Sequence, residues 1–248
     1  MSSKRSQKIG LIALLILAAG LVISSNLWKS NLKVSHVVVE GNRIVETAEI
    51  LRLVKVEKNA RLHDVDLMGV RKDVLSHHFI KDAVVERDLP ATLKITITER
   101  APLAIVNGAE ILYLDQEGIV LPHSISKQLF DLPVLTGVSP DVALVPGTMV
   151  HNADVQEALA ILATSKLVGK ELSHMISEVR LRNGGDIVLY GAERGVPVIF
   201  GRGNIADKLV RLEAFWNDVV REQGLDKLQY VDLRFDDQVV VRWNQKRG

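Results

Sequence analysis

A run of apolar residues near the start of the chain limits the possible architectures most. It extends from Ile9 to Ile23, interrupted only by two glycines, and three basic residues with no acidic one precede it. Extended through Trp28, it comprises roughly 20 residues, about 30 Å of helix, which is enough to cross a bilayer. The basic flank predicts a cytoplasmic N-terminus, and Trp28 suits a membrane interface. The sequence therefore predicts a transmembrane helix over residues 9–28, in contact with the lipid bilayer, behind a cytoplasmic tail of residues 1–8.

The same start also fits a signal peptide that is cleaved after export, because small residues such as Ser24 and Ser25 follow the apolar core. Length favours the anchor, since this core is at or beyond the ~15-residue upper end of signal peptides. The rest of the chain is exported in both cases. No later segment is comparably long and apolar, so we expect a single-pass protein with its bulk on the periplasmic or extracytoplasmic side.

The composition narrows the class of protein further. The 248 residues include no cysteine, which excludes disulfides, zinc-thiolate sites and thiol nucleophiles, so an exported domain must be stabilised by its core. Hydrophobic residues make up 47% of the chain, enough for one large or two small domains. A net charge of +1 and 4% aromatic residues give no reason to expect a nucleic-acid partner.

A small α+β domain is predicted directly after a short linker, residues 29–33. A strand over Val34–Glu40 comes first, and two short helices follow, with Thr47 and Asp64 as their expected N-caps. Two strands, Ile80–Arg87 and Thr92–Glu99, come next. In the second of them apolar and polar residues alternate, which indicates one buried and one solvated face.

This order of strand, helix, helix, strand, strand resembles a POTRA domain over residues 34–102. The motifs that carry the resemblance are Val39-Glu40-Gly41-Asn42, Arg87-Asp88-Leu89-Pro90-Ala91-Thr92-Leu93 and Thr98-Glu99-Arg100-Ala101-Pro102. The resemblance implies a module outside the cytoplasm that contacts other polypeptides rather than small molecules. Another small α+β domain with similar patterning is the alternative.

The remaining part, residues 103–248, is predicted to be β-rich, with a long antiparallel-dominated sheet and flanking helices. Proline and glycine separate short apolar runs. The predicted strands are Leu103–Val106, Ile111–Leu114, Gly118–Leu121, Leu132–Leu135, Ile176–Leu181, Asp186–Tyr190 and Val196–Phe200. Helices are predicted over Asp154–Leu167 and Ile205–Arg221.

Two further strands are predicted at the end, Tyr230–Phe235 and Gln238–Trp243, joined by Asp236-Asp237. The final strand is β-branched, and only five residues follow it. It can form the edge of its sheet, with unpaired backbone groups that accept a strand from another protein. It can also be a central strand, because sequence order does not determine sheet order.

Taken together, these features resemble the bacterial cell-division family FtsQ, also called DivIB, over nearly the whole chain. The most specific pieces lie at the domain junction and near the end: Thr98-Glu99-Arg100-Ala101-Pro102-Leu103-Ala104 and Tyr230-Val231-Asp232-Leu233-Arg234-Phe235. The resemblance implies a non-enzymatic scaffold in the cytoplasmic (inner) membrane at the division septum. It also implies that the protein binds FtsB and FtsL outside the cytoplasm and links them to other divisome membrane proteins.

The family resemblance also implies where partners bind. In the family the terminal strand accepts a strand from FtsB, and a basic residue on the preceding helix contacts the same partner; Lys208 occupies that place here, with Arg211 as a substitute. Trp243 is a plausible apolar anchor and Arg242 a charge for an acidic partner. The candidate partner-binding residues are Lys208, Arg211, Tyr230, Gln238, Val239, Val240, Val241, Arg242 and Trp243.

Enzymatic alternatives have weak support. Gly201 to Ala206 fits the G-x-G-x-x-G/A spacing of dinucleotide sites, but a Rossmann unit needs alternating βαβ elements, and the surroundings are mostly β. Adjacent His77 and His78 do not make the i, i+4 pair of a metal site. We therefore expect no catalytic residue, metal, cofactor or small-molecule substrate. An envelope POTRA-type interaction module, or a peptidoglycan-binding module not dedicated to division, remains the alternative function.

Overall fold

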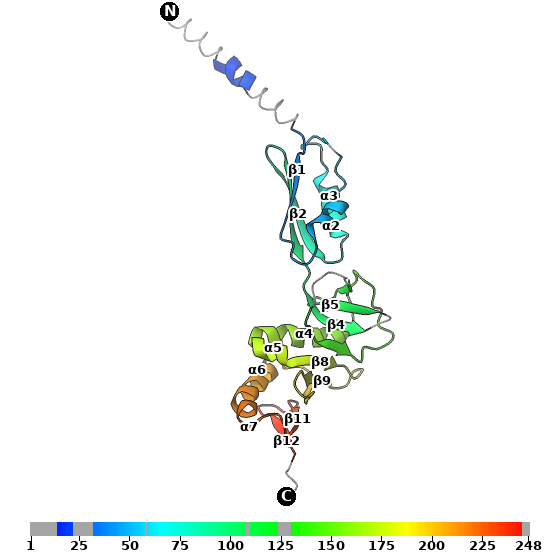
Figure 1. Ribbon diagram of the computed structural model, residues 1–248, viewed down its shortest axis with the longest axis vertical. Helices are drawn as coiled ribbons and strands as arrows, with labels where there is room; N and C mark the ends of the chain where they lie inside the picture. Colours follow the sequence, from blue (N-terminus) through cyan, green and yellow to red (C-terminus); the bar gives the residue numbers. More distant parts are fainter. Residues whose placement is uncertain (1–13, 22–31, 58, 108–109, 124–129, 245–248) are drawn as a thin grey trace, which may run out of the picture. The chain divides into compact units, whose positions relative to one another are not determined.

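The computed structural model describes residues 14–21, 32–57, 59–107, 110–123 and 130–244. Its contacts divide the chain into two compact units, before and after the Glu99–Arg100 bond (Figure 1). The predicted transmembrane helix over residues 9–28 lies largely outside the described residues. Only residues 14–21 of this range are described, and they are helical. Within the described ranges, no helix combines the length and the apolar character needed to cross a membrane.

The first unit has the predicted order of strand, helix, helix, strand, strand. Its elements are β1 (His36–Glu40), α2 (Thr47–Leu53), α3 (Leu67–Leu75), β2 (Ile80–Asp88) and β3 (Thr92–Glu99). The sheet order is β1-β3-β2, with β1 parallel and β2 antiparallel to the central β3. Alternation buries Leu93, Ile95 and Ile97 of β3 beneath the helices, as the sequence pattern predicted.

Both predicted helix caps of this unit were wrong by one or two residues. Asp66, not Asp64, caps α3, because its carboxylate accepts hydrogen bonds from the N–H groups of Met68 and Gly69. Glu46 occupies the cap position of α2, and Thr47 is already its first helical residue. Several neighbouring acidic and hydroxyl residues are suitable N-caps by residue type, and only the backbone path decides which of them begins the helix.

The second unit contains a mixed nine-stranded sheet. Its strands are β4 (Pro102–Asn107), β5 (Ile111–Asp115), β6 (Val120–Pro122), β7 (Val134–Thr136), β8 (Ile176–Arg180), β9 (Ile187–Gly191), β10 (Pro197–Gly201), β11 (Leu228–Asp232) and β12 (Val240–Trp243). They lie in the order β12-β11-β10-β9-β8-β7-β4-β5-β6. Five of the eight neighbouring pairs are antiparallel and three are parallel, so antiparallel pairing predominates, as predicted.

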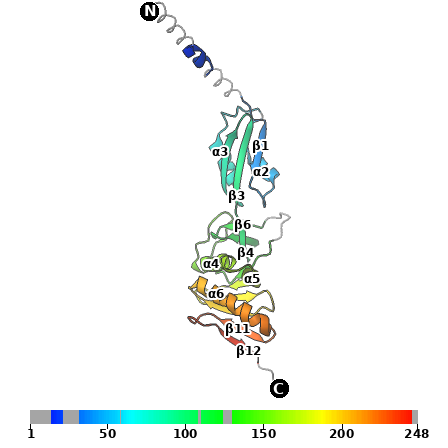
Figure 2. The ribbon, with the colours of Figure 1, turned by 90° about the vertical axis from the view of Figure 1, so that its left-hand side faces the viewer.

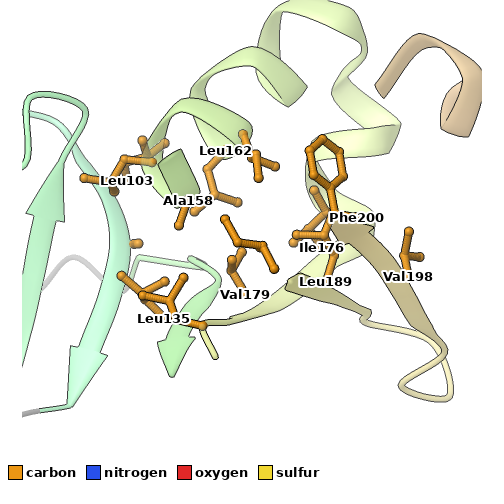
Figure 3. Packing of buried hydrophobic residues seen from close by; sticks show 14 of the residues in the cluster. Leu103, Leu135, Ala158, Leu162, Ile176, Val179, Leu189, Val198 and Phe200 are labelled. Carbon is orange, nitrogen blue, oxygen red and sulfur yellow. The ribbon is translucent and has the colours of Figure 1, made fainter. Parts of the chain in front are cut away.

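Helices pack against this sheet and close its hydrophobic core. They are α4 (Ala153–Val168), α5 (Lys170–Met175), α6 (Ile205–Phe215), a π-helical segment (Trp216–Val220) and α7 (Arg221–Gln223). Figure 3 shows Ala158 and Leu162 of α4 pointing toward Val179 of β8, with Phe200 of β10 close by. The sequence pattern missed the short α5, and the helix predicted over Ile205–Arg221 changes from α to π geometry after Phe215.

Candidate partner-binding edge

The last strand, β12, forms one edge of the nine-stranded sheet. Among the described residues it pairs only with β11, antiparallel, with Tyr230 opposite Arg242 and Asp232 opposite Val240. The edge alternative of the sequence analysis is therefore the one observed. The strand is shorter than predicted, because Gln238 and Val239 still belong to the connection from β11.

Two hydrogen bonds outside the ladder establish which backbone groups of β12 face the open side. Leu233 N–H donates to Ile199 O of β10, and Asn244 N–H donates to Lys227 O. The backbone N–H and C=O groups of successive residues in a strand point to opposite sides. Because the N–H of Leu233 points to β10, the backbone groups of residues 230 and 232 point to β12. Because the N–H of Asn244 points to the side of β11, the backbone groups of residue 242, two positions earlier, also point to β11. The N–H and C=O groups of Val241 and Trp243 consequently point outward, away from β11.

The side chains of this strand alternate between the two faces of the sheet. Val239, Val241 and Trp243 pack against the core of the unit and are partly buried. Arg242 is exposed on the opposite face, opposite Tyr230 of the neighbouring strand. The predicted apolar anchor Trp243 thus contacts the core of its own chain with part of its ring surface.

Arg211 holds the connection between β11 and β12. Its Nη1 donates to Phe235 O and Gln238 O, at 2.9 Å each, from α6, which lies over the strands at this end of the sheet (Figure 2). These two carbonyls flank the turn at Asp236-Asp237, where Asp237 has a left-handed backbone with φ of 56°. The aromatic ring of Phe235 stays 47% exposed beside this turn.

Lys208, one turn earlier on α6, is buried with only 3% of its surface exposed. Its Nζ donates to Phe200 O at 3.0 Å and Arg202 O at 2.7 Å, and it lies 5.2 Å from the Phe200 ring centre. Burial lowers the pKa of Lys208, and the positive charge of Arg211 lowers it further. In this structure the ammonium group binds the turn between β10 and α6, while Arg211 lies closer to the surface.

That turn contains the glycines that mimic a dinucleotide motif in the sequence. Gly201 and Gly203 have φ of +70° and +64°, so they provide the left-handed conformations of a sharp turn into α6. A Cβ on Gly201 would lie 2.7 Å from Cγ of Arg234. Arg202 between them forms ion pairs with Asp154 and Glu157 of α4, at 2.8 Å each.

A charged cluster at the end of β11 was not predicted as part of the site. Arg234 binds the carboxylate of Asp232 at 2.7 Å and that of Asp186 at 2.9 Å. Hydrogen bonds from Arg234 lower the pKa of the buried Asp232, and the pKa of Arg234 is raised in turn. Both residues lie in the Tyr230–Phe235 motif, but the distant Asp186 could not be connected to them by any local pattern.

Comparison with known proteins assigns both units. Residues 32–100 match the family model "POTRA domain, FtsQ-type", and residues 104–234 match "Cell division protein FtsQ/DivIB, C-terminal". The chain is 30% identical over 223 residues to "Cell division protein FtsQ" of Rhodothermus marinus, covering 87% of this chain and 80% of the relative. It is 29% identical over 238 residues to the protein of that name from Salinibacter ruber, covering 92% and 90%. For the relative from Geobacter sp. strain M21 the identity is 28% over 211 residues, covering 85% and 76%. The chain therefore belongs to the FtsQ/DivIB family of bacterial cell-division proteins.

Proposed function

We propose that this protein is a non-enzymatic scaffold of the division machinery that binds FtsB and FtsL outside the cytoplasm and links them to other division proteins. FtsB adds a strand to the sheet along β12. The single observation that carries the proposal is the open edge, where the N–H and C=O groups of Val241 and Trp243 point away from β11. An added strand pairs with such groups and gains affinity from main-chain hydrogen bonds.

Side chains around the edge supply the specificity that backbone pairing lacks. Arg242 offers an exposed positive charge to an acidic residue of the partner, and Tyr230 lies opposite it on the same face. Phe235 presents an exposed aromatic ring beside the turn that precedes β12. Val239, Val240 and Gln238 complete the surface that the partner covers.

Lys208 and Arg211 act in this proposal as positioning residues. Arg211 already donates hydrogen bonds to the carbonyl oxygens of Phe235 and Gln238, so the partner strand pairs only with residues after Gln238. Lys208 fixes the start of α6 through two carbonyl oxygens and thereby holds Arg211 over the hairpin. A partner contacts the exposed part of Arg211 and does not reach Lys208.

An anchor over residues 9–28 completes the proposal. A helix that spans the cytoplasmic membrane restricts the protein and its membrane-bound partners to two dimensions. Such tethering raises the effective concentration of one partner near another without a new contact. The N-terminus is cytoplasmic, both folded units are extracytoplasmic, and the protein gathers at the division septum.

A proline at residue 241 tests strand addition most directly. V241P removes an N–H group that points to the open side, while V241A trims the same side chain and keeps that group. We expect the full-length V241P protein to lose capture of FtsB from the same genome by at least about tenfold, and V241A to retain it. Affinity capture from membranes that contain both proteins measures the difference.

Two results would contradict the proposal. Equal capture of FtsB by V241P and wild type excludes pairing along β12. Uniform membrane fluorescence of a fusion protein in cells that depend on it for normal division excludes the septal role.

A further inference from the structure

A groove of about 640 Å³ lies among the helices of the second unit. Five segments form its walls: α5, the connection between β9 and β10, the end of α6 at Glu213, the π-helical segment with α7, and the loop over residues 224–226. Its apolar floor consists of Leu172, Met175, Trp216, Val220 and Leu225. The volume falls within the range of about 300–1,000 Å³ that is common for ligand pockets. No β12 residue lines the groove in the described part of the chain.

The charges along the groove do not balance. Four carboxylates, two arginines and His174 line it, and the arginines already bind two of the carboxylates: Arg221 pairs with Glu171, and Arg194 pairs with Asp226. The other two carboxylates, Glu193 and Glu213, have no cationic partner among the described residues.

Glu213 is the more informative of these two carboxylates, because it is only partly exposed. Its Oε1 lies so close to Gly169 that a Cβ on this glycine would be 1.9 Å from the oxygen. The absence of a side chain at residue 169 therefore makes room for a negative charge between α4 and α5. A carboxylate that is partly withdrawn from water and unpaired attracts a cation.

Two of the segments that line this groove have unusual backbone geometry. Arg194 has a left-handed backbone with φ of 59°, which is uncommon for a residue other than glycine. Trp216 begins the π-helical segment, a geometry that often occurs at functional sites. Trp216 and Asn217 of this segment line the groove, and Val220 at its end is buried.

We propose that this groove binds a segment of a protein partner in which a lysine or arginine is flanked by apolar residues. The apolar flanks cover the floor, and the cation pairs with Glu213 and Glu193 beside the aromatic ring of Trp216. The two ion pairs across the groove are solvent-exposed and contribute little, so a partner can open them easily. This inference rests on the proposed scaffold function and adds a second partner site to it.

Labelled peptides test the groove on the full-length protein. The probe is a nine-residue peptide with a central lysine between leucine and valine residues, and its matched control carries norleucine in place of the lysine. Fluorescence anisotropy measures both affinities for wild type, E213Q, W216L and E222Q. Glu222 is an exposed acid of α7 that does not line the groove, so E222Q is the control for charge alone.

We expect the lysine peptide to bind wild type and E222Q equally and to bind E213Q about tenfold more weakly. W216L weakens binding as well, and the norleucine peptide binds all four proteins weakly. Equal affinity for the two peptides, or an unchanged affinity of E213Q, overturns the proposal. An unchanged melting curve of E213Q shows that its fold is intact.

Other occupants of the groove give distinct results. A protein that ends at Asn244 and binds the peptide much more tightly indicates that residues 245–248 occupy the groove, which overturns the proposal. A peptide affinity that weakens as the protein concentration rises indicates that a second copy of the chain occupies the groove, and this result overturns the proposal too. Capture of FtsB on the same samples separates the two proposals, since V241P loses FtsB and keeps the peptide, whereas E213Q does the reverse.

Discussion

The two edges of the nine-stranded sheet differ in how their backbone groups are occupied. At β6 the chain covers its own edge: Val120 N–H donates to Thr148 O, Gly147 N–H donates to Val120 O, and Val150 N–H donates to Gly118 O. A bridge between Ile119 and Met149 adds to this cover. At β12 no described segment plays that part, and Val241 and Trp243 direct their peptide groups outward.

This difference shows that an uncovered edge is not a necessity of the fold. Natural proteins protect sheet edges because an open edge invites pairing with other chains. Here a loop of four residues is enough to protect β6, which is itself only three residues long and ends at Pro122. The open edge at β12 is therefore the feature of this sheet on which the proposed strand addition depends.

The strongest test of this contrast uses two prolines on adjacent residues of β12. V240P removes an N–H group that faces β11, so we expect it to lower the free energy of unfolding by about 2–4 kcal/mol. V241P removes an outward group and costs less than about 1 kcal/mol. Urea denaturation followed by circular dichroism measures both. Equal destabilisation by the two prolines would show that the outward and inward groups of β12 have been assigned wrongly.

Removing the ammonium group of Lys208 tests whether α6 supports the open edge. K208M leaves the carbonyl oxygens of Phe200 and Arg202 without this donor, so we expect a loss of about 1–3 kcal/mol. D207N, at an exposed position of the same helix, is the control and should stay within about 0.5 kcal/mol of wild type. Faster hydrogen exchange at residues 235–240 in K208M would link the helix to the hairpin. Wild-type stability of K208M would instead mean that water replaces the lysine.

The closed edge can be opened by a single methyl group. Gly147 has φ of +84°, so G147A strains the loop that covers β6 and costs about 1–2 kcal/mol. We expect faster hydrogen exchange at the amide of Val120, as at the amide of Val241 in the wild-type protein. Adding FtsB should slow exchange at Val241 and leave Val120 unchanged. Protection of both amides in wild type without a partner would remove the contrast between the edges.

The smallest expected effect is a dependence of stability on pH near the open edge. Because Arg234 lowers the pKa of Asp232 below its ordinary value of 3.8, the pair stabilises the fold fully above that value, and this contribution is lost as the pH falls through the lower folded pKa. The loss should be at most about 1 kcal/mol, since Arg234 is partly exposed. Urea midpoints between pH 5 and pH 2 should fall less steeply for D232N than for wild type; parallel curves would refute this linkage.

Much of the fold follows from local sequence patterns. Alternation in Thr92–Glu99 correctly predicted the buried face of β3, and the period of apolar residues in Asp154–Leu167 correctly predicted α4. Such patterns report which side of an element is buried. Helix α5 was not predicted, because its six residues make too few turns for a helical period to be recognised.

The site was less predictable because it depends on residues that are distant in sequence. The order of strands in the sheet decides whether β12 is an edge, and no single segment of the sequence predicts that order. Lys208 looks like a surface cation in the sequence, yet two carbonyl oxygens at the β10–α6 turn allow its burial. The proposed function therefore makes Lys208 a positioning residue in place of the direct contact that the family resemblance implies, while the partner-binding roles of Arg211, Tyr230 and the residues 238–243 stay predictions.

The shortness of β12 also bears on how fast a strand paired with it would dissociate. Only Val241 and Trp243 within this four-residue strand direct peptide groups outward, and four hydrogen bonds of about 0.5–1.5 kcal/mol each give modest binding by themselves. Affinity differences of this kind appear mainly in the dissociation rate. If a partner strand adds here as proposed, an edge this short favours a complex that forms while its members are concentrated together and dissociates when they disperse.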